Sequence, residues 1–267
     1  MIPQDYHIHT NFSCDSSATM SSMCQIAIKK GIHEIGFSEH LDHHPKDECT
    51  GFFRVEEWWE ELDRCREKFR GELIIRAGIE ISEPHQYPDE VDALLGAFPW
   101  DYALGSLHWI DDDIVFEEDY FHRSEREAYV DYLNELESMV EVGTFDILAH
   151  MDTVKRYGYE YYGKYNPVND EAQIRRILNA AASRNVALEI NTITLRRPVN
   201  ETSPSLKILE WFREEGGRWI TLGSDAHTPE EVAKDVDLAL KLVRNAGYSL
   251  LAQFNQRQPS PLKLPGY

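Results

Sequence analysis

Short apolar stretches alternate with amphipathic stretches along the whole chain. Seven of the short stretches are rich in β-prone residues and predict strands at 2–9, 33–40, 73–80, 102–109, 145–152, 186–192 and 219–227. The segments between them carry apolar residues at helical spacing and predict helices near 20–30, 55–70, 88–97, 124–142, 168–184, 203–215 and 229–246. Strands that alternate with helices run parallel and are joined by right-handed crossovers. The pattern therefore predicts an α/β fold with a closed or nearly closed barrel, in which residues 1–267 form one domain.

Residues that bind metal ions in proteins stand at the C-terminal ends of these predicted strands. His7 and His9 end the first one, and both imidazoles face the same point because alternate residues of a strand point to the same side. The later strands end with His40, Glu80, His108, His150, Asp225 and His227. Six of the seven stretches thus supply a His, Asp or Glu to the face of the barrel on which active sites lie. Because imidazole and carboxylate groups bind divalent metals, we predict a polynuclear metal site there.

The charge balance restricts what the protein can bind. The chain has 27 basic and 47 acidic residues, a formal net charge of −20, which argues against a nucleic-acid polymer or an anionic membrane as partner. An anionic small molecule would bind only where positive charge is gathered locally. The opening MIPQDYHIH lacks the pattern of a signal peptide, and no apolar run approaches the ~20 residues of a membrane span, so we expect a cytoplasmic protein.

The four cysteines form no CxxC pair, and in a reducing cytoplasm we expect them to stay reduced. They are Cys14, Cys24, Cys49 and Cys65. Cys14 stands beside the predicted site, where we expect it to be a small filling residue.

Six short motifs follow one another on successive predicted strands. They are YHIHT (6–10), FSEH (37–40), GIE (78–80), GSLH (105–108), LAHMD (148–152) and GSDAH (223–227). Through these motifs the chain resembles the polymerase and histidinol phosphatase (PHP) superfamily over nearly its whole length. The resemblance implies a distorted seven-stranded (β/α) barrel of the TIM-like kind, with a trinuclear metal centre.

The resemblance also implies how the ligands divide among three metal ions. The implied sets are His7, His9, Glu80 and Asp225 for the first metal, a bridging Glu80 with His108 and His150 for the second, and Asp15, His40 and His227 for the third. Many members have histidine where this chain has Asp15, and the aspartate, together with GSLH and EINT (189–192), resembles the histidinol-phosphatase branch. Such ligand sets accept Zn, Mn or Fe, so the sequence leaves the identity of the metal open.

Counting charges at this centre favours a phosphate ligand. Three divalent ions exceed the charge of Glu80, Asp15 and Asp225, so that even with a bridging hydroxide the centre keeps about two positive charges. That charge complements a phosphomonoester dianion. Since metal coordination lowers the pKa of water from 15.7 to about 7, we expect in-line attack of such a hydroxide on phosphorus.

Three arginines and two histidines are candidates for further roles. Arg196 and Arg197 follow the sixth predicted strand and Arg156 follows the fifth, where a guanidinium would bind phosphate. We favour Arg196 and Arg156 as catalytic and substrate-binding residues over Arg197, because adjacent residues rarely both point inward. In the LDHH segment (41–44), His43 would protonate the leaving group, or His43 and His44 would contact the substrate, unless this is simply an exposed loop. The acidic loop 111–119 is either solvated or meets a cationic substrate amine.

The expected function is that of a phosphomonoesterase for a small phosphate ester, and the resemblance implies hydrolysis of L-histidinol phosphate in histidine biosynthesis. One alternative is a PHP phosphatase or phosphodiesterase that acts on nucleotides or another small ester. A second is an amidohydrolase-like enzyme that cuts C–N bonds, although no lysine ends any of the seven stretches. A third is a non-catalytic PHP scaffold. The oligomeric state is left open.

Overall fold

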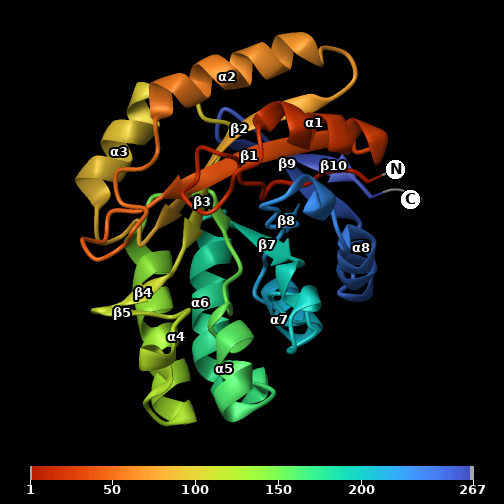
Figure 1. The fold of residues 1–267 in the computed structure, drawn as a ribbon. Helices are drawn as coiled ribbons and strands as arrows, with labels where there is room; N and C mark the ends of the chain where they lie inside the picture. Colours follow the sequence, from red (N-terminus) through yellow and green to blue (C-terminus); the bar gives the residue numbers. More distant parts are fainter. Residues whose placement is uncertain (1, 265–267) are drawn as a thin grey trace.

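The computed structural model describes residues 2–264, and its centre is a curled sheet of six parallel strands (Figure 1). In spatial order the strands are β1 (Glu34–Leu41), β2 (Ile74–Ser82), β3 (Tyr102–Ser106), β6 (Ile147–Leu148), β7 (Ala187–Asn191) and β8 (Ile220–Gly223). Spatial order equals chain order, as expected when every βα unit adds its strand on the same side through crossovers of one hand. Six of the seven predicted strands are thus present and parallel.

The first predicted strand, 2–9, is not one of the six. It forms isolated parallel bridges, which pair Ile2 with Ile32, Asp5 with Ile35 and Ile8 with Ala226. The Tyr6 amide also donates to the Leu222 carbonyl of β8 over 2.8 Å. The segment therefore lies between β1 on one side and β8 on the other. Tyr6 stacks on Tyr102 of β3, while the neighbouring His7 contacts Glu80 of β2. Two successive side chains therefore face the same interior, which breaks the alternation that a regular strand requires.

Helices cover the outside of the sheet (Figure 1). They are α1 (Met20–Lys29), α2 (Val55–Lys68), α3 (Pro88–Ala97), α4 (Glu125–Val142), α5 (Val154–Tyr162), α6 (Glu171–Ser183), α7 (Leu206–Glu214) and α8 (Val236–Asn245), with short 3-10 turns η1 (Glu118–Phe121), η2 (Pro167–Asp170), η3 (Ile193–Arg196) and η4 (Pro229–Glu231). All α-helices except α5 were predicted from apolar spacing. At the start of α4, the Glu127 amide donates to the Ser124 hydroxyl and the Ser124 amide to the Glu127 carboxylate, a capping box. Among residues 2–264, no helix has the length and apolar character needed to cross a membrane.

Two hairpins were not predicted. The small one pairs β4 (Trp109–Ile110) with β5 (Asp113–Ile114), and the larger one pairs β9 (Leu250–Asn255) with β10 (Gln258–Lys263). Phe254 of β9 is buried with Tyr6 and Tyr102, and its amide donates to the Tyr6 hydroxyl. The larger hairpin therefore contributes side chains to the interior of the sheet.

The inner face of the sheet changes character along the strands. Gly36 and Gly78 lie against the Tyr102 ring, because a Cβ at either position would come within 2.2 Å of that side chain. Further along the same faces, β1 presents His40 and β2 presents Glu80, which are paired in the sheet register. Aromatic packing thus fills the interior at the start of the strands, and polar residues occupy it at their C-terminal ends.

Candidate metal centre

All nine predicted metal ligands come together at the C-terminal ends of the strands, around Glu80. Its Oε2 lies 3.2 Å from His7 Nε2 and 3.1 Å from His40 Nδ1. Its Oε1 lies 2.9 Å from His150 Nε2 and 3.5 Å from His108 Nε2. Since His9 Nε2 also lies 3.5 Å from Oε2, the two oxygens of one carboxylate face different sets of imidazoles, which is the arrangement that a bridging ligand needs.

Asp225 closes a second group with the two histidines of the first motif. Its Oδ1 lies 3.4 Å from His9 Nε2 and 3.8 Å from His7 Nε2. His9 Nε2 is buried and has no hydrogen-bond partner among the described residues. A buried nitrogen without a hydrogen-bond partner costs free energy, and a metal ion would satisfy it.

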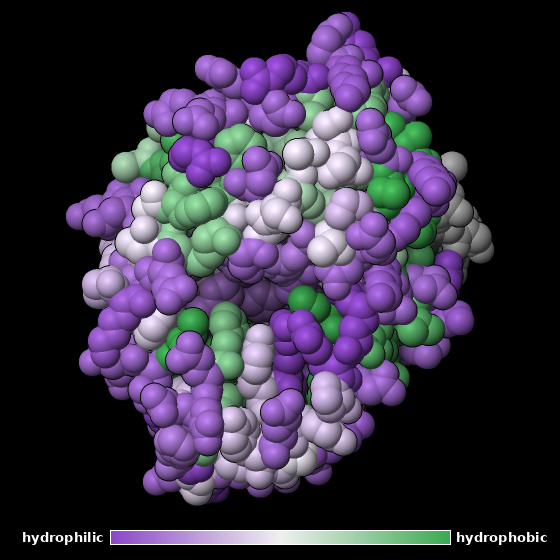
Figure 2. Space-filling view, viewed as in Figure 1, coloured by the Kyte–Doolittle hydropathy of each residue, from purple (hydrophilic) through white to green (hydrophobic). Residues whose placement is uncertain are grey.

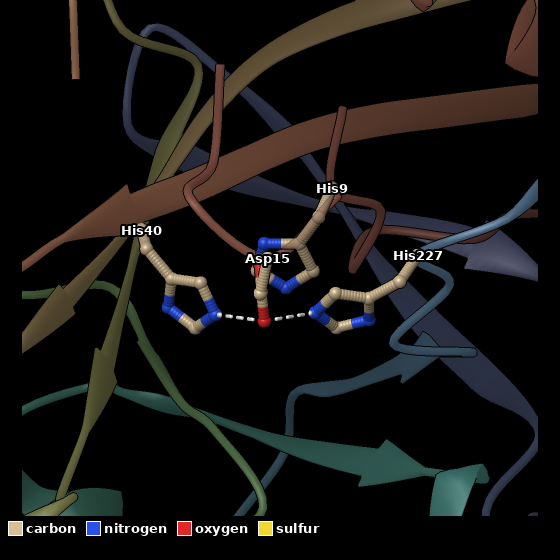
Figure 3. Close-up of side chains that lie close together, drawn as sticks. All are labelled: His9, Asp15, His40 and His227. Atoms are coloured by element: carbon tan, nitrogen blue, oxygen red, sulfur yellow. Dashed lines mark ion pairs between the residues drawn. The ribbon is translucent and has the colours of Figure 1, made fainter. Parts of the chain in front are cut away.

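Asp15 joins a third group at the open side of the cluster. Its Oδ2 lies 2.8 Å from His227 Nε2 and 3.5 Å from His40 Nε2, and Figure 3 shows the carboxylate between these two rings. His9 stacks on His40 and on His227 with ring centroids 4.3 Å apart in both cases. The Asp15 side chain is 46% exposed, whereas that of Glu80 is 1% exposed. The third group is therefore more open to solvent than the group around Glu80.

This cluster fits divalent metal ions. The donor atoms of His9, Asp15, His40 and His227 lie within 4.8 Å of one another, and the same holds for the two groups His7–Glu80–His150 and His7–His9–Asp225. Nitrogen and carboxylate oxygen donors at such spacing are the ligands that Zn, Mn and Fe take in proteins. The nine residues could hold metal in the sets that the resemblance implies, although His108 lies in a close group with His40 and Asp42.

The charges within the cluster set the protonation of two of its ligands. Burial alone would raise the pKa of Glu80, but the neighbouring His7 and His40 hold that pKa well below its usual range. Burial lowers the pKa of His9 to about 3, and His227 and His40 act in the same direction. At neutral pH, Glu80 is therefore ionised and His9 is neutral, the forms in which each binds a metal.

The Nδ1 atoms of two imidazoles contact residues that were not predicted from the sequence. His7 Nδ1 lies 2.6 Å from Glu189 Oε1, and His9 Nδ1 lies 3.1 Å from the Ser13 hydroxyl. Glu189 could have been found, because it lies two residues after Ala187 on the inward face of the one predicted strand that had no metal-binding candidate. Such partners fix the orientation of a ligating imidazole.

Two arginines stand free over the metal centre. Arg156 and Arg197 line the cavity above Glu80, together with Phe116 and Tyr157. The Arg156 guanidinium lies 4.8 Å from the centroid of the Tyr157 ring. Neither guanidinium forms a hydrogen bond or ion pair with any residue in 2–264. Both are therefore available to an anion.

Arg196, the arginine favoured from the sequence, does not line this cavity. Its Nη2 donates to the Ser224 carbonyl over 2.9 Å, and its Nε lies 3.6 Å from Glu231. The 3-10 turn η3 ends at Arg196 and sends its side chain back against the protein, while Arg197, ranked lower, reaches the cavity.

His43 and His44 also lie outside the cavity lining, contrary to the predicted contacts with substrate. The His43 ring packs 5.3 Å from that of Tyr87. His44 stacks on Trp109 at 4.0 Å, and its Nε2 lies 3.1 Å from the Asp111 carbonyl. Both rings are used in packing the loop that follows β1.

A second cavity adjoins the metal centre and is acidic. It shares Asp15, His40, His108 and Phe116 with the first cavity and extends to Asp47, Glu48, Trp109 and Glu117. Asp47 accepts a hydrogen bond from the Trp109 indole over 2.8 Å, whereas the carboxylates of Glu48 and Glu117 have no partner among the described residues. Glu117 belongs to the acidic loop 111–119, while Asp112 of that loop pairs with Lys46 at 3.0 Å. Figure 2 shows a hydrophilic hollow near the middle of this face.

A disulfide joins Cys14 and Cys49, contrary to the expectation that all four cysteines are reduced. Cys14 precedes Asp15 in the chain, and Cys49 lines the acidic cavity. Cys24 and Cys65 are free and buried. The pairing depends on two loops that meet only in the folded protein, with Cα atoms 5.4 Å apart.

Comparison with known proteins shows extensive similarity. The family model of the PHP domain matches residues 5–193. Histidinol-phosphatase of Lactococcus lactis subsp. lactis is 31% identical over 256 residues, which cover 94% of this chain and 94% of that protein. A probable histidinol-phosphatase of Deinococcus radiodurans is 29% identical over 264 residues, 96% of this chain and 98% of that protein. The crystal structure of histidinol phosphate phosphatase from L. lactis, complexed with zinc, L-histidinol and phosphate, is similar with a TM-score of 0.89 and 29% identity, over 97% of this chain and 98% of that chain.

Proposed function

The chain belongs to the PHP domain family, and from this premise we propose that it is a metal-dependent phosphomonoesterase that hydrolyses L-histidinol phosphate to L-histidinol and phosphate in histidine biosynthesis. The observation that carries the proposal is a cleft with two unlike ends. One end combines the cluster around Glu80 with two free guanidiniums, and the other carries two free carboxylates, Glu48 and Glu117. A phosphate ester with a cationic head group matches both ends.

At the phosphate end, the residues of this chain bind and orient the ester. We infer that Arg156 and Arg197, which line the cavity, bind the non-bridging oxygens of the phosphate, because a guanidinium gives paired hydrogen bonds to two oxygens. Bound divalent metal ions supply positive charge and an activated water. The arginines would hold the phosphate in a fixed orientation and stabilise the charge that develops on its oxygens in the transition state.

At the other end, acidic and aromatic residues select the head group. L-histidinol carries an ammonium group and an imidazole. Glu48 and Glu117 offer unpaired carboxylates to the ammonium, and Trp109 and Phe116 offer ring faces to the imidazole. A nucleoside monophosphate would bring only neutral or anionic groups to these carboxylates, which disfavours the nucleotide alternative.

The three groups of donor atoms support a proposal for the number of metal ions. We propose three divalent ions, with Glu80 shared between the His7–His9–Asp225 group and the His108–His150 pair, and with Asp15, His40 and His227 holding the third. We further propose that residues 2–9 act with the six strands as a distorted seven-membered barrel, and that residues 1–267 are one metallohydrolase domain.

The test is phosphate release by zinc-loaded and manganese-loaded enzyme from L-histidinol phosphate, a nucleoside monophosphate and p-nitrophenyl phosphate. We expect the highest kcat/KM for L-histidinol phosphate. In Glu48→Gln/Glu117→Gln, KM for L-histidinol phosphate should rise while kcat/KM for p-nitrophenyl phosphate, which has no cation, stays unchanged. A wild-type enzyme that prefers the nucleotide would contradict the assignment. An equal loss of kcat/KM for L-histidinol phosphate and p-nitrophenyl phosphate in the double variant would contradict it as well.

A further inference from the structure

Glu189 is a buried carboxylate that belongs to none of the three proposed ligand sets. It lies on β7 with its side chain 1% exposed, and its two oxygens meet three donors from different parts of the chain. Oε1 lies 2.6 Å from His7 Nδ1. Oε2 accepts from the His150 amide over 2.8 Å and from Asn191 Nδ2 over 3.3 Å. A buried carboxylate with this many partners has little freedom to move.

The partners of Glu189 are tied to two of the metal sets and not to the third. His7 belongs to the first set, and the His150 backbone carries a ligand of the second. Asn191 Nδ2 also donates to Asp225 Oδ2 over 3.2 Å, which links Glu189 to a further ligand of the first set. No described contact joins Glu189 to Asp15, His40 or His227.

The backbone of Gly223 lies directly against Glu189 and His7. A Cβ at Gly223 would lie 2.1 Å from Glu189 Oε1 and 2.6 Å from His7 Cβ. Only glycine at this position lets the carboxylate and the imidazole approach each other. The contact between His7 and Glu189 therefore depends on the glycine of the neighbouring strand, β8.

We propose that Glu189 is a positioning residue that sets the affinity of the His7-containing metal site. By accepting the Nδ1–H of His7, it leaves the Nε2 lone pair pointing toward Glu80 and Asp225, where the ion binds. It also fixes the backbone that carries His150. This inference rests on the metal-dependent function proposed above.

Glutamine cannot replace the carboxylate, although it has the same shape. Glu189 accepts three hydrogen bonds, whereas a glutamine amide has one oxygen and one NH2 group. With its oxygen toward His7, the NH2 group opposes the His150 and Asn191 donors. With its NH2 group toward His7, it forces the proton of that imidazole onto Nε2, where it blocks the metal. Glu189→Asp keeps the charge but is one methylene too short to reach both His7 and His150.

The experiment measures metal retention rather than turnover. Wild type, Glu189→Gln, Glu189→Asp and the control Asp146→Asn are loaded with zinc and dialysed against graded EDTA, and zinc per chain is determined by elemental analysis. Asp146 is also a largely buried carboxylate, but its partners are Arg257 and the Ala103 amide, away from the cluster. Circular dichroism and the unfolding midpoint of each protein are recorded in parallel.

We expect both Glu189 variants to release one zinc ion at an EDTA concentration about 10–100-fold lower than wild type, the usual effect of removing a partner behind a ligating imidazole. Asp146→Asn should lower the unfolding midpoint without changing zinc release. In Asp15→Asn/Glu189→Gln two ions should be weakened, because the two residues serve different sites.

Zinc retention equal to wild type in either Glu189 variant would overturn the inference, as would a loss no larger than that of Asp146→Asn. Failure of the wild type itself to bind zinc would instead refute the proposed function. The two failures are therefore distinguishable.

Discussion

Some charged side chains near the cleft already bind other residues of the protein, whereas others have no partner and can bind a ligand. The Arg196 guanidinium donates to the Ser224 carbonyl and pairs with Glu231, whereas Arg156 and Arg197 have no such partner among residues 2–264. A cation that is already paired contributes little to a new anion, because binding would first have to break its existing contacts. Position beside a site is therefore a weaker indicator of function than an unpaired charge facing it.

The three arginines give a matched comparison. Arg197→Ala and Arg156→Ala should each lower kcat/KM for L-histidinol phosphate by roughly 10²-fold, because each removes charge from the transition state. Arg196→Ala should change kcat/KM by less than about 3-fold, since its side chain does not reach the cavity. Steady-state kinetics with zinc content measured for each variant checks this. A large loss in Arg196→Ala with full zinc content would restore the role that the sequence suggested.

Asp15 is the ligand candidate nearest to solvent. Asp15→Asn replaces a charged donor with a neutral amide oxygen, so it should weaken the ion held with His40 and His227 while the His7–His9 site stays loaded. Activity should fall and recover in part at high zinc concentration. Asp15→His should retain metal but change the preference between L-histidinol phosphate and a nucleoside monophosphate. Zinc per chain and kcat/KM for both esters decide the matter; full occupancy and full activity in Asp15→Asn would exclude Asp15 as a ligand.

Among the elements, the loops after residues 2–9 and after β1 are joined covalently. The Cys14–Cys49 disulfide closes a segment with a sequence separation of 35 and fixes the residue next to Asp15 to a wall of the acidic cavity. Inside the sheet, by contrast, the segments are held together by packing. The stacked rings of Tyr6 and Tyr102, with centroids 4.8 Å apart, fill the space beneath the cluster. The strands are thus positioned by the core, and the loops around the mouth by a cross-link.

Reduction of this disulfide should loosen the mouth more than the core. For a loop of this length the chain-entropy model gives about 3–4 kcal/mol, which sets an upper expectation for the loss in free energy of unfolding. Dithiothreitol or Cys49→Ser should lower stability and ease zinc loss from the Asp15 site. Urea unfolding and zinc retention provide the measurement. In Cys49→Ser, dithiothreitol should have no further effect; an effect of equal size there would assign the change to another group.

At the scale of the whole molecule, bound metal ions would offset the acidic charge of the chain at one place. Without metal, carboxylates and imidazoles of the cluster neutralise one another. Burial alone would lower the pKa of His40, but Glu80 and Asp15 raise it to about 10. Burial would raise the pKa of Asp225, but His7 and His9 hold it well below its usual range. Bound metal replaces the protons of the imidazoles.

Metal removal should therefore change how stability depends on pH. A histidine whose pKa is raised stabilises the fold below its unfolded pKa of about 6.5, and this contribution is lost as the pH rises toward 10. A carboxylate whose pKa is depressed stabilises the fold above its unfolded pKa of about 4, and this contribution is lost as the pH falls. The chelated protein should lose stability between pH 7 and about 10, while the zinc-loaded protein should not. Thermal unfolding of both forms at several pH values tests this; parallel profiles would show that the cluster is not the source.

The alternation of apolar and polar residues determines the order of the helices and strands and the direction of many of their side chains. Strand and helix periods are properties of the local backbone, so the order of βα units, the inward direction of His40 and Glu80, and their place at the C-terminal ends could be predicted. Six short motifs carried the family for the same reason, since each is one short continuous stretch of the chain.

Only the tertiary structure decided which distant residues meet. His7 and Glu189 are 182 residues apart, and nothing in either segment specifies the other. The choice between Arg196 and Arg197 depends on how η3 ends against Ser224, and the Cys14–Cys49 pair depends on two loops without a period. Residues 2–9 departed from the predicted strand because Tyr6 packs on Tyr102 from β3. In each case the deciding energy comes from contacts between segments, which local periodicity does not encode.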